Sequence, residues 1–174
     1  MFLFAGRFVA YKNLPLVIKA FDYLYQKYRS GKLELVGGGP DEITLKTLVQ
    51  SLVSAPAISF FPALPQAQLF ERIKQATVCL APALTEFNPN FILEGLSLGR
   101  PAVISRPNGL TVSLPSEWQF DPQSLDSLIK ALERWYDQAY LNHAQTLITQ
   151  IPFAHGWDEV ITEHLKLLKV VTII

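Results

Sequence analysis

The sequence is poor in several residue types, and each shortage excludes a class of protein. Cysteine occurs once, at Cys79, so a disulfide framework and a cysteine-based structural zinc site are both excluded. Lysine and arginine together number 15, as do aspartate and glutamate, and the basic residues form no run. A neutral chain of this kind gives no electrostatic reason to expect nucleic acid as a partner.

Long apolar runs and histidine clusters are lacking as well. No apolar stretch approaches the length that spans a bilayer, and the charge of Arg7 follows the apolar start of the chain, the reverse of a signal peptide. The three histidines, His143, His155 and His164, show no metal-ligand spacing, so we predict no metal site. We therefore predict a cytoplasmic protein.

What the sequence contains instead is apolar residues in short, spaced runs. Hydrophobic residues make up 49% of its 174 positions, enough for one continuous core. Runs typical of strands occur at 2–4, 33–36, 57–61, 78–81 and 102–105, and helical apolar stripes lie between them at 14–28, 45–52 and 69–76. This alternation predicts an α/β fold, a Rossmann-like parallel sheet with helices on both faces.

After Pro122 the pattern is helical alone. We predict helices at 124–140, about 140–149 and 157–168, so that a helical C-terminal extension of about 123–174 follows a core of about 1–122. We expect residues 1–174 to form a single domain. Because strand-like residues begin at position 2, we also expect the chain to be cut from a longer protein or encoded as one half of a split pair.

Three segments with candidate ligand-binding residues follow predicted strands at one edge of the sheet. Gly6 and Arg7 follow the first strand, the glycines at 37–39 follow the second, and Glu86 follows the fourth. Ligands of open parallel sheets bind at the carboxyl ends of the strands, so these segments converge on one site. Arg7 and Lys12 could reach the same anion, although two cations in a loop can also be merely solvated.

Two carboxylates eight residues apart, Glu86 and Glu94, flank the predicted turn into a helix. Asn88 is the predicted N-cap and Pro89 the first helical residue, which places Glu94 about one and a half turns inside the helix. The free amides of a helix N-terminus suit a phosphate, so the segment favours a sugar phosphate or a nucleotide. The alternative is a capped helix with two solvated glutamates.

Other motifs are incomplete. The glycines at 37–39 allow a close backbone approach, but Glu42 stands where the dinucleotide fingerprint needs glycine, and a tight strand-to-helix turn explains them equally well. Residues 95–99 fit the Gly-x-Ser-x-Gly pattern of serine hydrolases around Ser97. A turn and a strand follow this segment, however, whereas a nucleophile elbow needs strand, turn and then helix.

Together these segments resemble the C-terminal half of GT-B glycosyltransferases, in particular the retaining enzymes of group 1, family four. The resemblance runs from residue 2 to about 168 and implies one half of a GT-B fold. It rests on Gly6-Arg7 with Lys12-Asn13, residues 35–40, residues 57–60, the pair Glu86 and Glu94, and residues 99–104.

The resemblance implies a donor-binding domain for a UDP-, GDP- or ADP-sugar, without a metal or other cofactor. By this likeness Arg7 and Lys12 hold the diphosphate, Glu86 contacts the transferred sugar, and Glu94 binds the ribose. It implies further donor contacts at Gly6, Gly38, Asn88, Asn90, Phe91 and Ile92.

Two departures and one missing part qualify this picture. The family has glycines after the first glutamate, where this chain has Phe87 to Asn90, and its downstream glutamate has no counterpart in 107–111. The family's acceptor-binding N-terminal domain has no counterpart in these 174 residues, so we expect them alone to bind donor without transferring it. That domain, in cis or as a separate chain, is the expected partner, and through it the protein could associate with the inner face of the membrane. The alternatives are a non-catalytic nucleotide-sugar-binding or assembly subunit of a split glycosyltransferase, and a degenerate domain.

Overall fold

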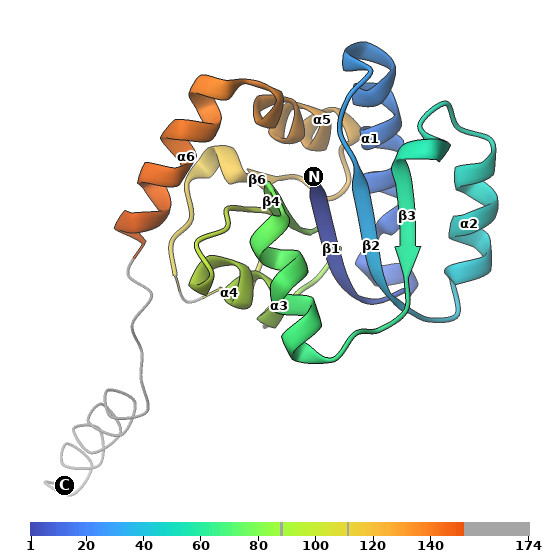
Figure 1. Ribbon diagram of the computed structural model, residues 1–174, viewed down its shortest axis with the longest axis horizontal. Coiled ribbons are helices and arrows are strands. Elements are labelled where there is room, and N and C mark those ends of the chain that lie inside the picture. The colour runs from blue at the N-terminus through green and yellow to red at the C-terminus, as the bar shows by residue number, and fades with distance from the viewer. Residues whose placement is uncertain (88, 111, 152–174) are drawn as a thin grey trace, which may run out of the picture.

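The computed structural model describes residues 1–87, 89–110 and 112–151, which form a parallel sheet covered by helices (Figure 1). The sheet has six strands in the order β3-β2-β1-β4-β5-β6, and every neighbouring pair is parallel. The strands are β1 Phe2–Arg7, β2 Leu33–Gly38, β3 Ile58–Phe61, β4 Val78–Ala81, β5 Ala102–Ser105 and β6 Gln119–Phe120. The predicted α/β class and parallel sheet are confirmed.

Helices cover both faces of this sheet. Right-handed crossovers place α1 and α2 on one face and, after the chain returns from β3 to β4, α3 and α4 on the other. The contacts agree, because α1 packs against α2 and α5, whereas α3 packs against α4. The helices are α1 Leu14–Tyr28, α2 Glu42–Gln50, α3 Gln66–Gln75, α4 Asn90–Ser97, α5 Leu125–Glu133 and α6 Gln138–Gln150.

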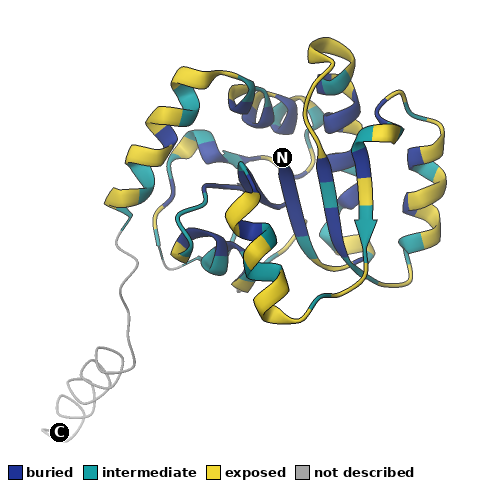
Figure 2. Ribbon diagram, viewed as in Figure 1, coloured by how far each residue is buried: buried dark blue, intermediate teal, exposed yellow. Residues whose placement is uncertain are grey.

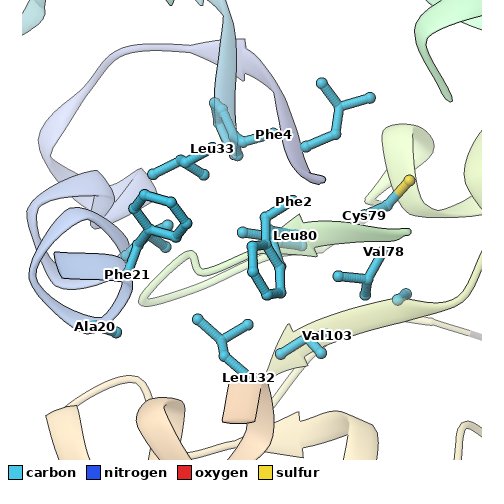
Figure 3. Close-up of a cluster of buried hydrophobic side chains, with 14 of the residues drawn as sticks. Phe2, Phe4, Ala20, Phe21, Leu33, Val78, Cys79, Leu80, Val103 and Leu132 are labelled. Atoms are coloured by element: carbon cyan, nitrogen blue, oxygen red, sulfur yellow. The ribbon is translucent and has the colours of Figure 1, made fainter. Parts of the chain in front are cut away.

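The core lies between the sheet and the helices, and the central strands are buried along most of their length (Figure 2). Figure 3 shows Phe2 of β1 among side chains from α1 and α5, with its ring 6.0 Å from that of Phe21 in an edge-on arrangement. Leu132 of α5 lies in the same cluster. Burial on both faces explains why the strand sequences are continuously apolar instead of alternating.

Several predicted boundaries need correction. The first two strands are longer than predicted and include Gly6-Arg7 and Gly37-Gly38, which pair with one another. The single helix predicted at 124–140 is wrong: α5 ends at Glu133, a 3-10 turn follows over Arg134–Tyr136, and α6 starts after Asp137, whose side chain accepts the Ala139 N–H at 2.8 Å. The predicted helix at 157–168 lies outside the described residues, and the division of the chain near 122 stays a prediction.

Within the part of the chain that the structure describes, no helix is both long and apolar enough to cross a membrane.

Candidate functional site

Two adjoining hollows lie at the carboxyl ends of β1 and β4, where the order of the strands reverses. The first hollow has a volume of about 190 Å³ and the second about 380 Å³, and they share the walls formed by Ala5 and Phe91. Reversal of strand order opens a crevice at this place in any sheet of this type. Larger hollows occur elsewhere, for example one of about 550 Å³ near Arg106, but these two contain the charged groups that the sequence predicted to converge.

Every predicted site residue that the structure describes lines one of these two hollows. The first hollow contains Lys12, Glu86, Asn90, Phe91 and Ile92. The second contains Gly6, Arg7, Gly38, Glu94 and again Phe91. Arg7 and Lys12 therefore belong to neighbouring hollows, although both leave the end of β1. The remaining predicted residue, Asn88, lies outside the described residues.

The glycines after β2 serve mainly the approach of two backbones. A Cβ atom on Gly37 would lie 1.9 Å from the carbonyl oxygen of Gly6, and one on Gly39 would lie 2.3 Å from that of Phe8. A Cβ atom on Gly38 would meet only a carboxylate oxygen of Glu42, at 3.5 Å, and Gly38 lines the second hollow. The tight strand-to-helix turn thus explains Gly37 and Gly39, while Gly38 is the glycine available to a ligand.

Lys12 and Glu86 form an ion pair inside the first hollow. Lys12 ends a 3-10 turn, Ala10–Lys12, that follows β1, and Glu86 lies in the loop after β4. Their side chains are only 18% and 14% exposed, so the pair is shielded from solvent more than an ordinary surface pair. The sequence predicted both residues at this site but did not predict that they bind each other.

Helix α4 begins one residue later than predicted. Asn90 is its first residue and Pro89 occupies the N-cap position, so the predicted N-cap at Asn88 and first helical residue at Pro89 are wrong. The carbonyl of Pro89 accepts the N–H of Ile92 at 2.8 Å. The amides of Asn90 and Phe91 precede this bond and lie at the wall of the first hollow, a suitable place for an anion.

A close contact between α4 and β4 fixes the helix against the sheet. A Cβ atom on Gly95 would lie 2.8 Å from Sγ of Cys79, so the helix backbone lies directly on the strand. Glu94, the preceding residue, is thereby directed toward the second hollow. Cys79 is fully buried in this contact, and burial raises the pKa of its thiol to about 12.

We expect Cys79 to make the protein less stable at high pH. Its thiol ionises near its normal pKa of 9.0 in the unfolded chain but near 12 when folded, so unfolding releases a proton in this interval. The stability linked to this thiol is intact below pH 9 and is lost by about 1.4 kcal/mol per pH unit above it. Urea unfolding at pH 8, 9, 10 and 11 should show a steeper loss for the wild type than for Cys79→Ala. Parallel curves for the two proteins would contradict this expectation.

The loop that carries Glu86 is braced by the loop after β5. The amide of Gly109 donates to the carbonyl of Glu86 at 2.8 Å, and the hydroxyl of Ser105 donates to the carbonyl of Ala83. A Cβ atom on Gly109 would lie 1.7 Å from the carbonyl oxygen of Phe87, so only glycine fits there. These bracing residues were not predicted from the sequence, because a glycine after Pro107-Asn108 indicates a turn but not the loop that the turn contacts.

The described residues contain neither the nucleophile elbow of a serine hydrolase nor a cluster of metal-ligand side chains. Ser97 is the last residue of α4, and its hydroxyl donates to the carbonyl of Glu94 at 2.8 Å instead of standing on a strand-to-helix elbow. No group of three or more His, Cys, Asp and Glu side chains is placed to hold a metal ion within 1–87, 89–110 and 112–151.

Comparison with known proteins identifies the family. Residues 1–150 match the family described as glycosyl transferases group 1. An uncharacterized glycosyltransferase of Methanocaldococcus jannaschii is 25% identical over 98% of this chain and 45% of its own length. A second, from Haemophilus influenzae, is 27% identical over 58% of this chain and 28% of its own length. The chain thus spans less than half the length of these relatives.

Solved structures share the fold. Sucrose-phosphate synthase of Thermosynechococcus elongatus superposes with a TM-score of 0.75 at 21% identity, over 99% of this chain and 45% of that one. A mutant of TarM from S. aureus, in complex with UDP, superposes with a TM-score of 0.76 at 11% identity, over 95% of this chain and 35% of that one. The matched parts are the C-terminal halves of GT-B structures. The chain belongs to the group 1 glycosyl transferases, family four, and has the fold of the C-terminal half of a GT-B enzyme.

Proposed function

We propose that this chain is the donor-binding half of a retaining glycosyltransferase and binds a nucleotide-diphosphate sugar. The observation that supports this most strongly is the convergence of the predicted residues on two adjoining hollows at the reversal of strand order. Membership of family four supports the retaining outcome. Because the chain spans less than half the length of its relatives, transfer would require an acceptor-binding N-terminal domain, in cis or as a separate chain.

The two hollows suggest a division of the donor between them. The first hollow, with Lys12 and the amides at the start of α4, suits the diphosphate and the sugar attached to it. The second is larger and mostly apolar, with Glu94 in its wall, which suits the nucleoside with its ribose hydroxyls at the carboxylate. Arg7 lines the second hollow, two residues after the shared wall at Ala5, and would reach the diphosphate from the nucleoside side.

In this proposal the chain's cations stabilise the leaving group. Transfer breaks the bond between the anomeric carbon of the sugar and the phosphate oxygen, so negative charge develops on the departing nucleoside diphosphate. Lys12, Arg7 and the amides of Asn90 and Phe91 would stabilise that charge, the task that a metal ion performs in other enzymes. Glu86 would accept hydrogen bonds from hydroxyls of the transferred sugar.

Replacement of Arg7 by alanine should weaken binding of the nucleoside diphosphate by about 1–3 kcal/mol, because a charge-assisted hydrogen bond to phosphate is lost. Calorimetric titration with UDP, GDP and ADP first identifies the nucleotide that the chain binds, and thermal shift provides a second measurement. Arg134→Ala is a matched control, since Arg134 is exposed in the 3-10 turn after α5 and lines neither hollow. A folded wild type that binds none of the three nucleotides would disprove the proposed function.

A split enzyme, in which a separate chain supplies the acceptor-binding domain, is the second candidate. In that case a neighbouring reading frame should encode a Rossmann-like acceptor domain. Co-expression of the two chains should then restore transfer that neither chain performs alone.

A further inference from the structure

The first hollow is electrically neutral when it is empty. Of the described residues that line it, only Lys12 and Glu86 carry charge, and they are bound to each other. The other walls are mostly apolar and include Leu80, Ala83 and Pro89. A diphosphate that enters this hollow therefore meets a lysine that already holds a carboxylate.

We propose that Glu86 occupies the place of the donor phosphate on Lys12 and thereby makes the site prefer the sugar-bearing donor over the free nucleoside diphosphate. This inference rests on the proposed function. Both ligands must displace Glu86 from Lys12, so both lose the same ion pair. Only the donor supplies sugar hydroxyl groups that donate hydrogen bonds to the displaced carboxylate.

The free nucleoside diphosphate leaves that carboxylate without a partner. The Glu86 side chain is only 14% exposed, and a poorly hydrated carboxylate that lacks hydrogen bonds is strongly disfavoured. The displaced group is also close to the diphosphate, which it repels. Glu86 therefore weakens binding of the free nucleoside diphosphate more than binding of the donor. After transfer, the return of Glu86 to Lys12 assists release of the nucleoside diphosphate.

The loop geometry keeps Glu86 over the hollow during this exchange. Its carbonyl accepts the Gly109 amide at 2.8 Å, and the carbonyl of Phe87 lies against the same glycine, where no Cβ would fit. The backbone of Glu86 is thus held in place by its contacts with Gly109. Rotation of the Glu86 side chain, without movement of the loop, is then enough to free Lys12.

The test compares free and sugar-bearing nucleotides in the Glu86→Gln variant. Calorimetry would use UDP, ADP and GDP together with UDP-glucose, UDP-N-acetylglucosamine, ADP-glucose and GDP-mannose, and the pair that the wild type binds most tightly would be followed. We expect Glu86→Gln to bind the free nucleoside diphosphate at least about threefold more tightly, because the competing carboxylate is gone. We expect its affinity for the sugar nucleotide to fall by at least about fivefold, because the amide of glutamine is a weaker hydrogen-bond acceptor for the sugar hydroxyls than a carboxylate.

Two further variants separate this mechanism from a general effect of charge. Glu71→Gln makes the same change on the exposed face of α3 and should alter neither affinity. In a Lys12→Met background, Glu86→Gln should lose most of its tightening effect, because the effect depends on release of the lysine.

Opposite changes for the two ligands support the inference, and equal changes or none for both overturn it while the proposed function stands. A folded wild type that binds none of these nucleotides would overturn the proposed function and this inference together.

Discussion

Replacement of Gly37 by alanine is expected to destabilise the domain by about 3 kcal/mol or more. Gly37 has a φ of 139°, a backbone conformation that residues with a side chain rarely adopt, and its added Cβ would lie 1.9 Å from the carbonyl oxygen of Gly6. This contact cannot relax easily, because Gly37 of β2 pairs with Gly6 of β1, and the next carbonyl, that of Gly38, accepts the Phe8 amide at 2.9 Å. Urea unfolding followed by tryptophan fluorescence would measure the change.

Gly38→Ala is the matched control for this prediction. A Cβ atom at Gly38 would meet only a carboxylate oxygen of Glu42 at 3.5 Å, an ordinary contact, so its stability should stay within about 1 kcal/mol of the wild type. Because Gly38 lines the second hollow, this variant should instead weaken nucleotide binding. A Gly37→Ala protein that unfolds at the wild-type urea concentration would show that the strand ends are less rigid than the structure indicates.

The sequence predicted the sheet well because its strands are covered on both faces. Continuous apolar runs such as that of β4 are buried at every position and cannot be mistaken for amphipathic strands. The sixth strand escaped prediction, since Gln119–Phe120 is two residues long and forms no pattern. The break between α5 and α6 escaped for another reason: Trp135 is buried within the 3-10 turn, so the apolar spacing continues although the helix does not.

The candidate site was predictable as a set of residues but not as a set of contacts. Each predicted residue lies at or after the carboxyl end of a strand, and parallel strands bring their carboxyl ends to one edge whatever the loops do. The pairing of Lys12 with Glu86 depends on two loops 74 residues apart. The brace from Gly109 depends on a backbone contact with the Glu86 loop, and neither contact leaves a pattern in the sequence.

The ion pair between Lys12 and Glu86 shows that Glu86 and Glu94 differ in how they can bind a ligand. Glu94 lines the second hollow from a helix that is fixed against β4 by the Gly95 contact, so it is positioned before any ligand arrives. Glu86 lies in a loop and its charge is already engaged by Lys12. Glu94 is therefore already in position to bind a ligand, whereas Glu86 must first leave Lys12. The spacing of the two glutamates in the sequence does not reveal this difference.

Replacement of Lys12 by methionine is expected to weaken binding of the nucleoside diphosphate by about 100-fold, more than the loss of Arg7. A charge-assisted contact to phosphate contributes about 1.5–3 kcal/mol, and Lys12 is the only cation among the described residues that line the first hollow. Methionine retains most of the length and apolar character of the lysine side chain, so the packing of the hollow changes little. Calorimetric titration measures the affinity.

The same variant should leave the affinity for the corresponding nucleoside unchanged, because base and ribose belong to the second hollow in the proposed arrangement. Lys74→Met is the matched control, since Lys74 pairs with Glu71 on the exposed face of α3 and touches neither hollow. An equal loss for nucleoside and nucleoside diphosphate would mean that Lys12 supports the fold of the site instead of binding phosphate. A loss confined to the diphosphate assigns the phosphate to the first hollow, and with it the direction in which the sugar must point, toward Glu86.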